Sequence, residues 1–251
     1  MPPTDAGPAV EHACAATTPD ADRPPAPPEQ GADGEDTLDL HLPDEFTALF
    51  GRTPGTGAAR SDDLLGGVGD WGPTRTPVGA FRLVPVRVER DLPVISRWMN
   101  DPAVAEFWQL AGEQRVTEAH LGAQLDGDGR SVPCLGLVDG TPMSYWEIYR
   151  ADLDPLARHY PARPHDTGVH LLIGSVADRG RGLGGALLRA VADLILDKRP
   201  GCARVVAEPD LRNAPSVAAF LTAGFRYAAE VGLPDKRAAL MVRDRSLRDL
   251  M

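Results

Sequence analysis

ADRGRGLGGALL, residues 177–188, is the stretch of sequence that decides the fold. It follows the apolar run VHLLIG at 169–174, which predicts a strand, and it opens a helix-periodic segment from about 183 to 198. Glycines at such a junction let successive backbone N–H groups turn toward one concavity, and the positive end of the helix dipole adds to the attraction for an anion. The loop therefore predicts a pyrophosphate-binding site.

Two familiar nucleotide sites differ from this loop. It lacks the Gly-Lys-Ser/Thr ending that grips the β and γ phosphates of a nucleotide together with magnesium. It also lies late in the chain, without a following strand that ends in Asp or Glu at the spacing of a dinucleotide-binding unit. An NTPase and a dinucleotide-dependent enzyme are therefore both disfavoured.

Short apolar runs separated by turn signals surround the loop and predict one compact α/β domain over 78–251. The clearest hairpin joins 132–139 to 143–150 through the turn Asp139-Gly140. The other expected strands are 81–86, 169–174, 203–208, 225–231 and 237–243, and helices are expected to start at Asp91 and Thr117 and to span 183–198 and 214–223.

The N-terminal part has a different composition. Residues 1–36 carry eight prolines, many alanines and acids, and too few large apolar side chains to offset the entropy of ordering. We expect a disordered acidic tail over 1–36 and a linker over 37–77 that includes one short element able to dock. Removal of residues 1–70 is then expected to leave the domain folded.

Charge and composition exclude several classes of protein. Of the net charge of −10, residues 1–40 account for −8, with nine acidic residues and Arg23, and the rest of the chain is nearly neutral. The sequence shows no basic stripe suited to the phosphate backbone of nucleic acid. No apolar run of about 18 residues and no secretion signal occurs. Cys14, Cys134 and Cys202 have no zinc-site spacing. We expect a cytoplasmic protein without a metal and without a nucleic-acid or membrane partner.

The segment from Arg179 to Gly184 resembles the Arg/Gln-x-x-Gly-x-Gly/Ala motif of the GCN5-related acetyltransferases. The resemblance implies an α/β fold with a mixed, mostly antiparallel central sheet flanked by helices, and it implies acyl-CoA as co-substrate. The residues that it assigns to coenzyme A are Arg179, Gly180, Arg181, Gly182, Leu183, Gly184, Gly185 and Asn213. Phe220 stands where many relatives have a Tyr that protonates the leaving thiolate, and phenylalanine cannot donate that proton.

Longer stretches are similar to a narrower group, the siderophore acyltransferases of the aerobactin N-hydroxylysine and mycobactin lysine type. They are WMNDPAVAEFW (98–108), YWEIYR (145–150), DTGVHLLIG (166–174), AEPDLRN (207–213) and KRAALM (236–241). This similarity implies transfer of an acyl group, acetyl or succinyl, to the amine or hydroxylamine nitrogen of a small lysine- or cadaverine-like acceptor. Within the group the sequence is most similar to the type that acylates N-hydroxycadaverine.

In the pattern of that group, the strand His and the Asp of Glu-Pro-Asp are catalytic, and they correspond to His170 and Asp210. An imidazole changes charge near neutral pH, so His170 is expected to act as the general base. Without the resemblance, His170 is more readily explained as a core residue and Asp210 as a helix cap.

The acceptor pocket is expected to include Trp108, Tyr145 and Glu147, because aromatic rings combine apolar area with a polar tip. Alternation along the strand places Tyr145 and Glu147 on one face and Trp146 on the other. Two alternatives stay open: an acetyltransferase of the same fold that acts on an aminoglycoside or another amine, and a non-enzymatic module that binds acyl-CoA.

Overall fold

The structure is a computed structural model that describes residue 65 and residues 67–250 of the 251-residue chain. The expected tail over 1–36 and the short element expected after residue 37 lie outside the described residues. Within them, no helix has both the length and the apolar character needed to cross a membrane.

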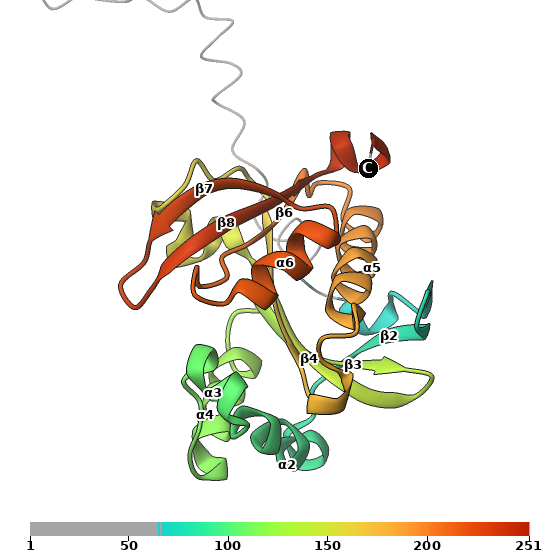
Figure 1. Ribbon diagram of the computed structural model, residues 1–251, viewed down its shortest axis with the longest axis vertical. Coiled ribbons are helices and arrows are strands. Elements are labelled where there is room, and N and C mark those ends of the chain that lie inside the picture. The colour runs from blue at the N-terminus through green and yellow to red at the C-terminus, as the bar shows by residue number, and fades with distance from the viewer. Residues whose placement is uncertain (1–64, 66, 251) are drawn as a thin grey trace, which may run out of the picture. The chain divides into compact units, whose positions relative to one another are not determined.

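Within the described residues, an eight-stranded sheet has the order β1-β2-β3-β4-β5-β6-β8-β7 (Figure 1). The strands are β1 (Thr74–Thr76), β2 (Gly79–Pro85), β3 (Ser131–Val138), β4 (Thr141–Arg150), β5 (Thr167–Ile173), β6 (Arg204–Ala207), β7 (Arg226–Gly232) and β8 (Arg237–Asp244). Every neighbouring pair is antiparallel except β5 and β6, which run parallel. The expected mixed, mostly antiparallel sheet is confirmed.

Helices cover both faces of this sheet (Figure 1). They are α2 (Val88–Met99), α3 (Pro102–Trp108), α4 (Gln114–Leu125), α5 (Leu183–Lys198) and α6 (Ala214–Thr222), with short 3-10 turns η1 (Val68–Asp70), η2 (Ala151–Leu153), η3 (Pro155–Arg158), η4 (Val176–Asp178) and η5 (Arg245–Leu250). Trp146 joins the core cluster of α5 and α6, whereas its neighbour Tyr145 joins the cluster of α2 and α4. Successive strand residues point to opposite faces, so the two helical layers lie on opposite sides of β4.

The parallel contact between β5 and β6 is short. It consists of the pairs Thr167–Val205 and Gly168–Val206, after which the two strands separate. A Cβ at Gly168 would lie 2.1 Å from the ring of Tyr149, so only glycine lets that ring lie against β5. The Tyr149 hydroxyl then donates to Glu208, just past the end of β6, at 2.7 Å. Beyond this point the edge of β5 that faces β6 is open.

Three helices differ from the sequence-based expectation. The helix expected from Asp91 begins at Val88, because the Asp91 carboxylate accepts the Arg87 N–H at 2.9 Å and so supports the first turn from within. The helix expected from Thr117 begins at Gln114. The short helix α3 was not expected. Its signal is Asp101 followed by proline, and the Asp101 carboxylate accepts from Ala103 N–H at 3.0 Å.

The folded domain begins before the expected boundary at residue 78. Leu65 and Val68 are 1% and 2% exposed and belong to the core cluster that also holds the α5 residue Leu187. Thr74–Thr76 adds β1 to the sheet through pairing with β2. Part of the expected linker is thus structural, and the expectation that residues 1–70 are dispensable stays a prediction.

Removal of residues 1–70 should lower the thermal midpoint relative to removal of residues 1–62. The longer deletion takes away Leu65 and Val68, and each buried aliphatic side chain contributes about 1.5–3 kcal/mol, so a difference of roughly 5–15 °C is expected. Scanning calorimetry of the two variants measures it. Midpoints within about 2 °C of each other would show that this segment adds nothing to the core.

Candidate functional site

The glycine loop leads directly into α5. Gly180 and Gly182 have φ angles of 71° and 77°, in the left-handed region that favours glycine. Gly182 is the N-cap residue of α5, and among the described residues no side chain caps that helix. A Cβ at either glycine would meet nothing within 4 Å. The N-terminus of α5 is therefore open on this side and offers its N–H groups and its dipole to an anion.

The other residues expected to bind coenzyme A divide into two groups. Arg179 donates to the Ile173 and Gly174 carbonyls at 3.0 Å and pairs with Asp101 at 2.8 Å, so its guanidinium braces the loop. Arg181, with 73% of its side chain exposed, is available to a ligand.

Three more residues of that set are part of the helix packing. Leu183 belongs to the core, and Gly184 and Gly185 face α6, where a Cβ at Gly185 would lie 3.1 Å from Thr222. These positions hold α5 against α6, and the backbone of the loop and Arg181 lie outside this packing.

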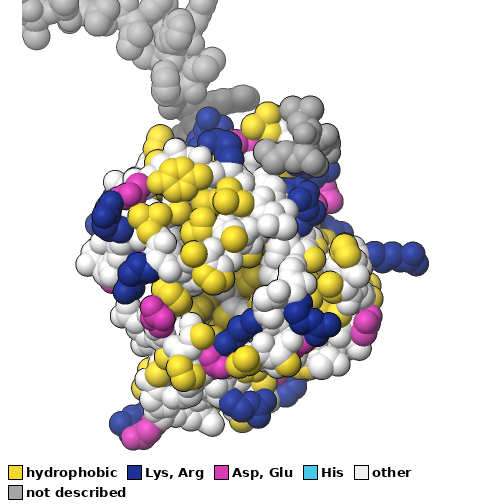
Figure 2. Space-filling view, viewed as in Figure 1, with side chains coloured by type: hydrophobic (Ala, Val, Ile, Leu, Met, Phe, Trp, Pro, Cys, Tyr) yellow, Lys and Arg dark blue, Asp and Glu magenta, His cyan; other side chains and the backbone are white. Residues whose placement is uncertain are grey.

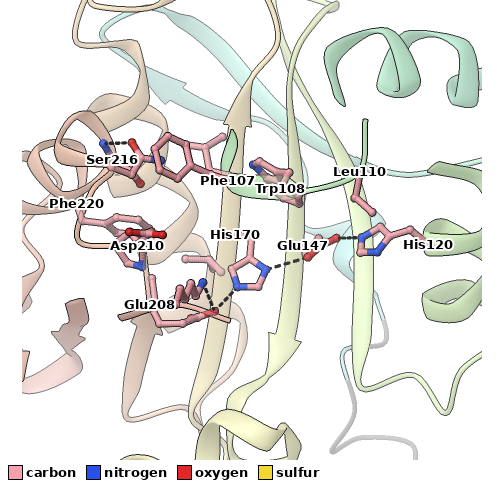
Figure 3. A pocket seen from close by; sticks show the side chains of 16 residues that line it. Phe107, Trp108, Leu110, His120, Glu147, His170, Glu208, Asp210, Ser216 and Phe220 are labelled. Carbon is pink, nitrogen blue, oxygen red and sulfur yellow. Dashed lines mark hydrogen bonds and ion pairs between the residues drawn. The ribbon is translucent and has the colours of Figure 1, made fainter. Parts of the chain in front are cut away.

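A cleft of about 230 Å³ opens where β5 and β6 separate (Figure 3). Its walls come from α3, α4, both sides of the separated strands, and α6. They are formed by Phe107, Trp108, Leu110, His120, Glu147, Val169, His170, Leu171, Ala207, Glu208, Pro209, Asp210, Asn213, Ser216, Phe220 and Lys236. In the space-filling view the molecule is hollowed near the middle of the face shown, where apolar side chains gather, with acidic and basic side chains beside them (Figure 2).

His170 lies between two carboxylates at the centre of the cleft (Figure 3). Its Nδ1 is 2.8 Å from Glu147 Oε2, and its Nε2 is 2.5 Å from Glu208 Oε1. An ionised carboxylate only accepts hydrogen bonds, so this geometry favours hydrogen on both ring nitrogens, as in an imidazolium. Burial by itself lowers the pKa of His170, but the charges of and hydrogen bonds to Glu208 and Glu147 outweigh it and raise the pKa to about 10.

Both carboxylates are fully engaged. Glu147 Oε1 accepts from His120 Nε2 at 2.5 Å, from Gln124 at 2.8 Å and from the Tyr145 hydroxyl at 2.9 Å. Burial alone raises the pKa of Glu147, but the hydrogen bonds from His120 and His170 hold it well below its usual range. Burial likewise opposes ionisation of Glu208, and the charge of His170 reverses that effect and lowers its pKa. The cluster is therefore a cation held by two anions.

This arrangement changes what His170 can do. A general base must begin with a free lone pair, and neither ring nitrogen has one while both donate to carboxylates. The expectation that His170 acts as a general base stays a prediction, and this geometry adds the alternative of a general acid. An imidazolium donates a proton, and 34% of the His170 side chain is exposed to the cleft.

The three residues expected to form the acceptor pocket differ in how deeply they lie in the wall of the cleft. Trp108 lines the cleft with its ring edge-on to His170, 6.0 Å between centroids. Glu147 lines the cleft too, and its Oε2 lies 2.8 Å from His170 Nδ1, so its role in binding the acceptor stays a prediction. Tyr145 is 0% exposed and lies beneath the wall, where it supports Glu147.

Asp210 and Asn213 line the cleft as well, but both side chains have local roles. The Asp210 carboxylate accepts from Arg212, at 2.7 Å from its guanidinium and 2.8 Å from its backbone N–H. The hydrogen bond from the Arg212 side chain lowers the pKa of Asp210. Asn213 accepts from Ser216 N–H at 3.2 Å and so caps α6.

Glu208, His120 and Lys236 reach the cleft without having been singled out from the sequence. Glu208 stands in the quoted AEPDLRN stretch, and its position at the end of a strand was a usable signal. His120 comes from α4, and its contact with Glu147 depends on how that helix crosses the sheet, which no local pattern encodes.

The fold and this cleft define the class of protein. The family model described as an acetyltransferase (GNAT) domain, Acetyltransf_8, matches residues 87–233, more than half of the chain. The chain belongs to this family and is an acyl-CoA-dependent acyltransferase.

Relatives of this chain have more specific names. The chain is 34% identical over 169 residues to "Lysine N-acyltransferase MbtK" of Mycobacterium sp. (strain MCS), covering 67% of this chain and 69% of that protein. It is 37% identical over 150 residues to "N(6)-hydroxylysine O-acetyltransferase" of Escherichia coli, covering 60% and 47%. Among solved structures, an uncharacterised protein of Bacillus halodurans superposes with a TM-score of 0.67 at 32% identity, covering 72% of this chain and 94% of that one.

Gly182→Val should raise the KM for acyl-CoA by at least tenfold. A β-branched residue resists φ near 77°, and its side chain would fill the open approach to the α5 N-terminus. The matched control is Gly140→Val in the β3–β4 turn, where φ is 82° and the Cβ space is equally open. Initial rates against acyl-CoA concentration measure the effect. An unchanged KM in a folded Gly182→Val protein, or an equal rise in the control, would remove the loop from the coenzyme site.

Proposed function

We propose that this enzyme transfers an acyl group, acetyl or succinyl, from acyl-CoA to the terminal amine or hydroxylamine nitrogen of a lysine- or cadaverine-like acceptor in siderophore biosynthesis, and that the hydroxylamine is the preferred acceptor. The preference rests on one observation: both ring nitrogens of His170 lie within hydrogen-bond distance of carboxylates, those of Glu147 and Glu208, an arrangement that favours the imidazolium. The relatives, named for lysine and N(6)-hydroxylysine, support the acceptor class.

The charge of His170 bears directly on the choice of acceptor. A lysine-like amine has a reference pKa of about 10.4 and reaches the cleft as an ammonium that must lose a proton before attack. An imidazolium cannot take that proton. A hydroxylamine nitrogen is less basic and mostly neutral at physiological pH, so it attacks without prior deprotonation. The geometry therefore favours the hydroxylamine.

His170 alone carries out both proton transfers of the reaction. The neutral nitrogen attacks the thioester carbonyl carbon, the C–S bond breaks, and the thiolate takes a proton from the imidazolium. The nitrogen, now acylated, returns its own proton to the imidazole, so the enzyme ends as it began. A thiol has a reference pKa of about 8.5, and the pKa of His170 is raised to about 10. The two pKa values differ by less than about two units, so the proton transfer from His170 to the thiolate is only slightly uphill. This role replaces the tyrosine that is absent at Phe220.

The positions of the two substrates follow from the same features. The glycine loop and Arg181 hold the pyrophosphate at the start of α5, and the open edge of β5 leads from there to His170. Trp108 and Phe107 form the apolar wall against which an aliphatic acceptor packs. Glu147, Glu208 and Asp210 act through the groups that they position: His170 for the two glutamates, and the turn before α6 for Asp210.

N-hydroxycadaverine or N6-hydroxylysine should be acylated with a kcat/KM at least 100-fold above that of cadaverine or lysine at pH 7.5. A site that binds a hydroxyl leaves polar groups unpaired when the analogue lacks it, and such a mismatch discriminates by up to about 10⁴. Thiol release with acetyl-CoA and succinyl-CoA measures the panel, with an aminoglycoside as a further acceptor. A plain amine or an aminoglycoside preferred over both hydroxylamines would contradict the proposal and leave the acyltransferase class intact.

The pH profile distinguishes an acid from a base at His170. With a hydroxylamine acceptor, kcat should stay level from pH 7 to 9 and fall as the pH approaches 10, because the imidazolium persists below its raised pKa and is lost above it. His170→Gln should lower kcat by roughly 10² to 10⁴, leave the Kd for acyl-CoA nearly unchanged and abolish the alkaline fall. A wild-type kcat that instead rises through about pH 6.5 would make His170 a base.

A further inference from the structure

Lys236 reaches the cleft from the hairpin that joins β7 to β8. It immediately precedes β8, and its carbonyl accepts from Leu233 N–H at 2.8 Å, which closes the turn. Its side chain lines the cleft and is 24% exposed. A cation on a turn usually extends into water, but this one is folded back against the wall that holds Glu208.

The ammonium of Lys236 lacks close partners. Within the part of the chain that the structure describes, its one ion pair is with Glu208 Oε1 at 3.8 Å, which is longer than a hydrogen bond. An ammonium has three donors, and leaving them unmet in a partly buried place is unfavourable. Nothing in the described wall uses these donors, so they are free for an oxygen of a ligand.

Glu208 and Asp210 have closer partners than this ammonium. Glu208 already accepts from His170 at 2.5 Å and from Tyr149 at 2.7 Å. Asp210 is held by Arg212 at 2.7 Å. Each acid thus has a short partner of its own, and Lys236 is the cation in the wall whose hydrogen-bonding capacity is unused.

We propose that Lys236 binds a carboxylate carried by one of the two substrates. This inference rests on the proposed function and names the group that the cleft recognises besides the reacting nitrogen. A carboxylate matches the charge and the donors of an ammonium, and it is small enough for a cleft of about 230 Å³. The phosphates of coenzyme A are assigned by the proposed function to the glycine loop at the start of α5.

A substrate carboxylate has two chemical sources. It belongs either to an amino-acid acceptor, such as N6-hydroxylysine, or to a dicarboxylic acyl group, such as succinyl. The acceptor N-hydroxycadaverine and the donor acetyl-CoA lack it. Four donor–acceptor pairs therefore separate the two sources, since each pair contains neither, one or both of the carboxylates.

The test compares wild type with Lys236→Met, which removes the charge and keeps much of the apolar stem, and with Lys236→Arg, which restores the charge. Arg237→Met is the matched control: it removes a cation from the next residue, whose side chain is 73% exposed and pairs with Glu230. The measurements are kcat and KM for the four pairs, together with the Kd of succinyl-CoA against acetyl-CoA and of lysine against cadaverine by calorimetric titration.

Lys236→Met should raise KM and Kd by roughly tenfold to a hundredfold for the carboxylate-bearing partner and leave the acetyl-CoA and N-hydroxycadaverine pair within about threefold, as loss of a charge-assisted hydrogen bond implies. A loss that follows lysine assigns the acceptor carboxylate, and a loss that follows succinyl-CoA assigns the acyl carboxylate. Recovery in Lys236→Arg supports either assignment.

Equal losses on all four pairs, mainly in kcat, would overturn the inference and place Lys236 at the reacting carbonyl. No loss in any Kd would overturn it as well. Failure of the proposed function has a different signature, namely absence of thiol release by the wild type with all four pairs. The titrations still report on Lys236 in that case, because they need no turnover.

Discussion

The pairing of β5 with β6 ends after two residue pairs, and the functional region depends on that ending. A continuous parallel pair would close the sheet and leave no room beside His170. Here the ring of Tyr149 lies against the glycine at 168 and reaches Glu208 just beyond β6, so one phenol fixes the width of the gap at its narrow end. The separated strands then supply the two sides of the cleft. The hydrogen-bonding capacity that the sheet gives up at this edge becomes available to a ligand.

The second constraint is electrostatic. Burying two carboxylates is unfavourable unless each has a partner, and one imidazolium serves Glu147 and Glu208 together. The outer hydrogen bonds, from Tyr145 on one side and Tyr149 on the other, orient the carboxylates without adding charge. The ring is therefore held in one plane before any substrate arrives, which is the preorganisation that electrostatic catalysis requires.

Most of the fold could be predicted from the sequence because its signals are local. These signals are the turn residues Asp139-Gly140, the apolar run of the strand before the glycine loop, and the helical periodicity of the segment after it. The structure has these elements at or within two residues of the expected places. The start of the domain was not predictable in the same way. Leu65 and Val68 stand in a Gly-rich stretch, and their burial comes from contact with the distant helix α5.

The site was only partly predictable, for the same reason. His170 and the loop glycines stand in recognisable stretches, and the structure places the histidine in the cleft and the loop at the start of α5. The charge state of His170 depends on Glu147, 23 residues away, and on Glu208, 38 residues away. Such a state is a property of assembled neighbours, and the expectation of a general base considered the imidazole alone.

The ion pair between Arg179 and Asp101 ties the glycine loop to the helix that ends at Trp108. The two residues are 78 positions apart in the sequence, yet Asp101 also caps α3, so one carboxylate serves both the helix and the brace. Segments exchanged between members of the family are therefore not independent modules at this point. A chimera that imports a new α3 to change the acceptor wall must import a partner for position 179 with it, or the coenzyme loop loses its anchor.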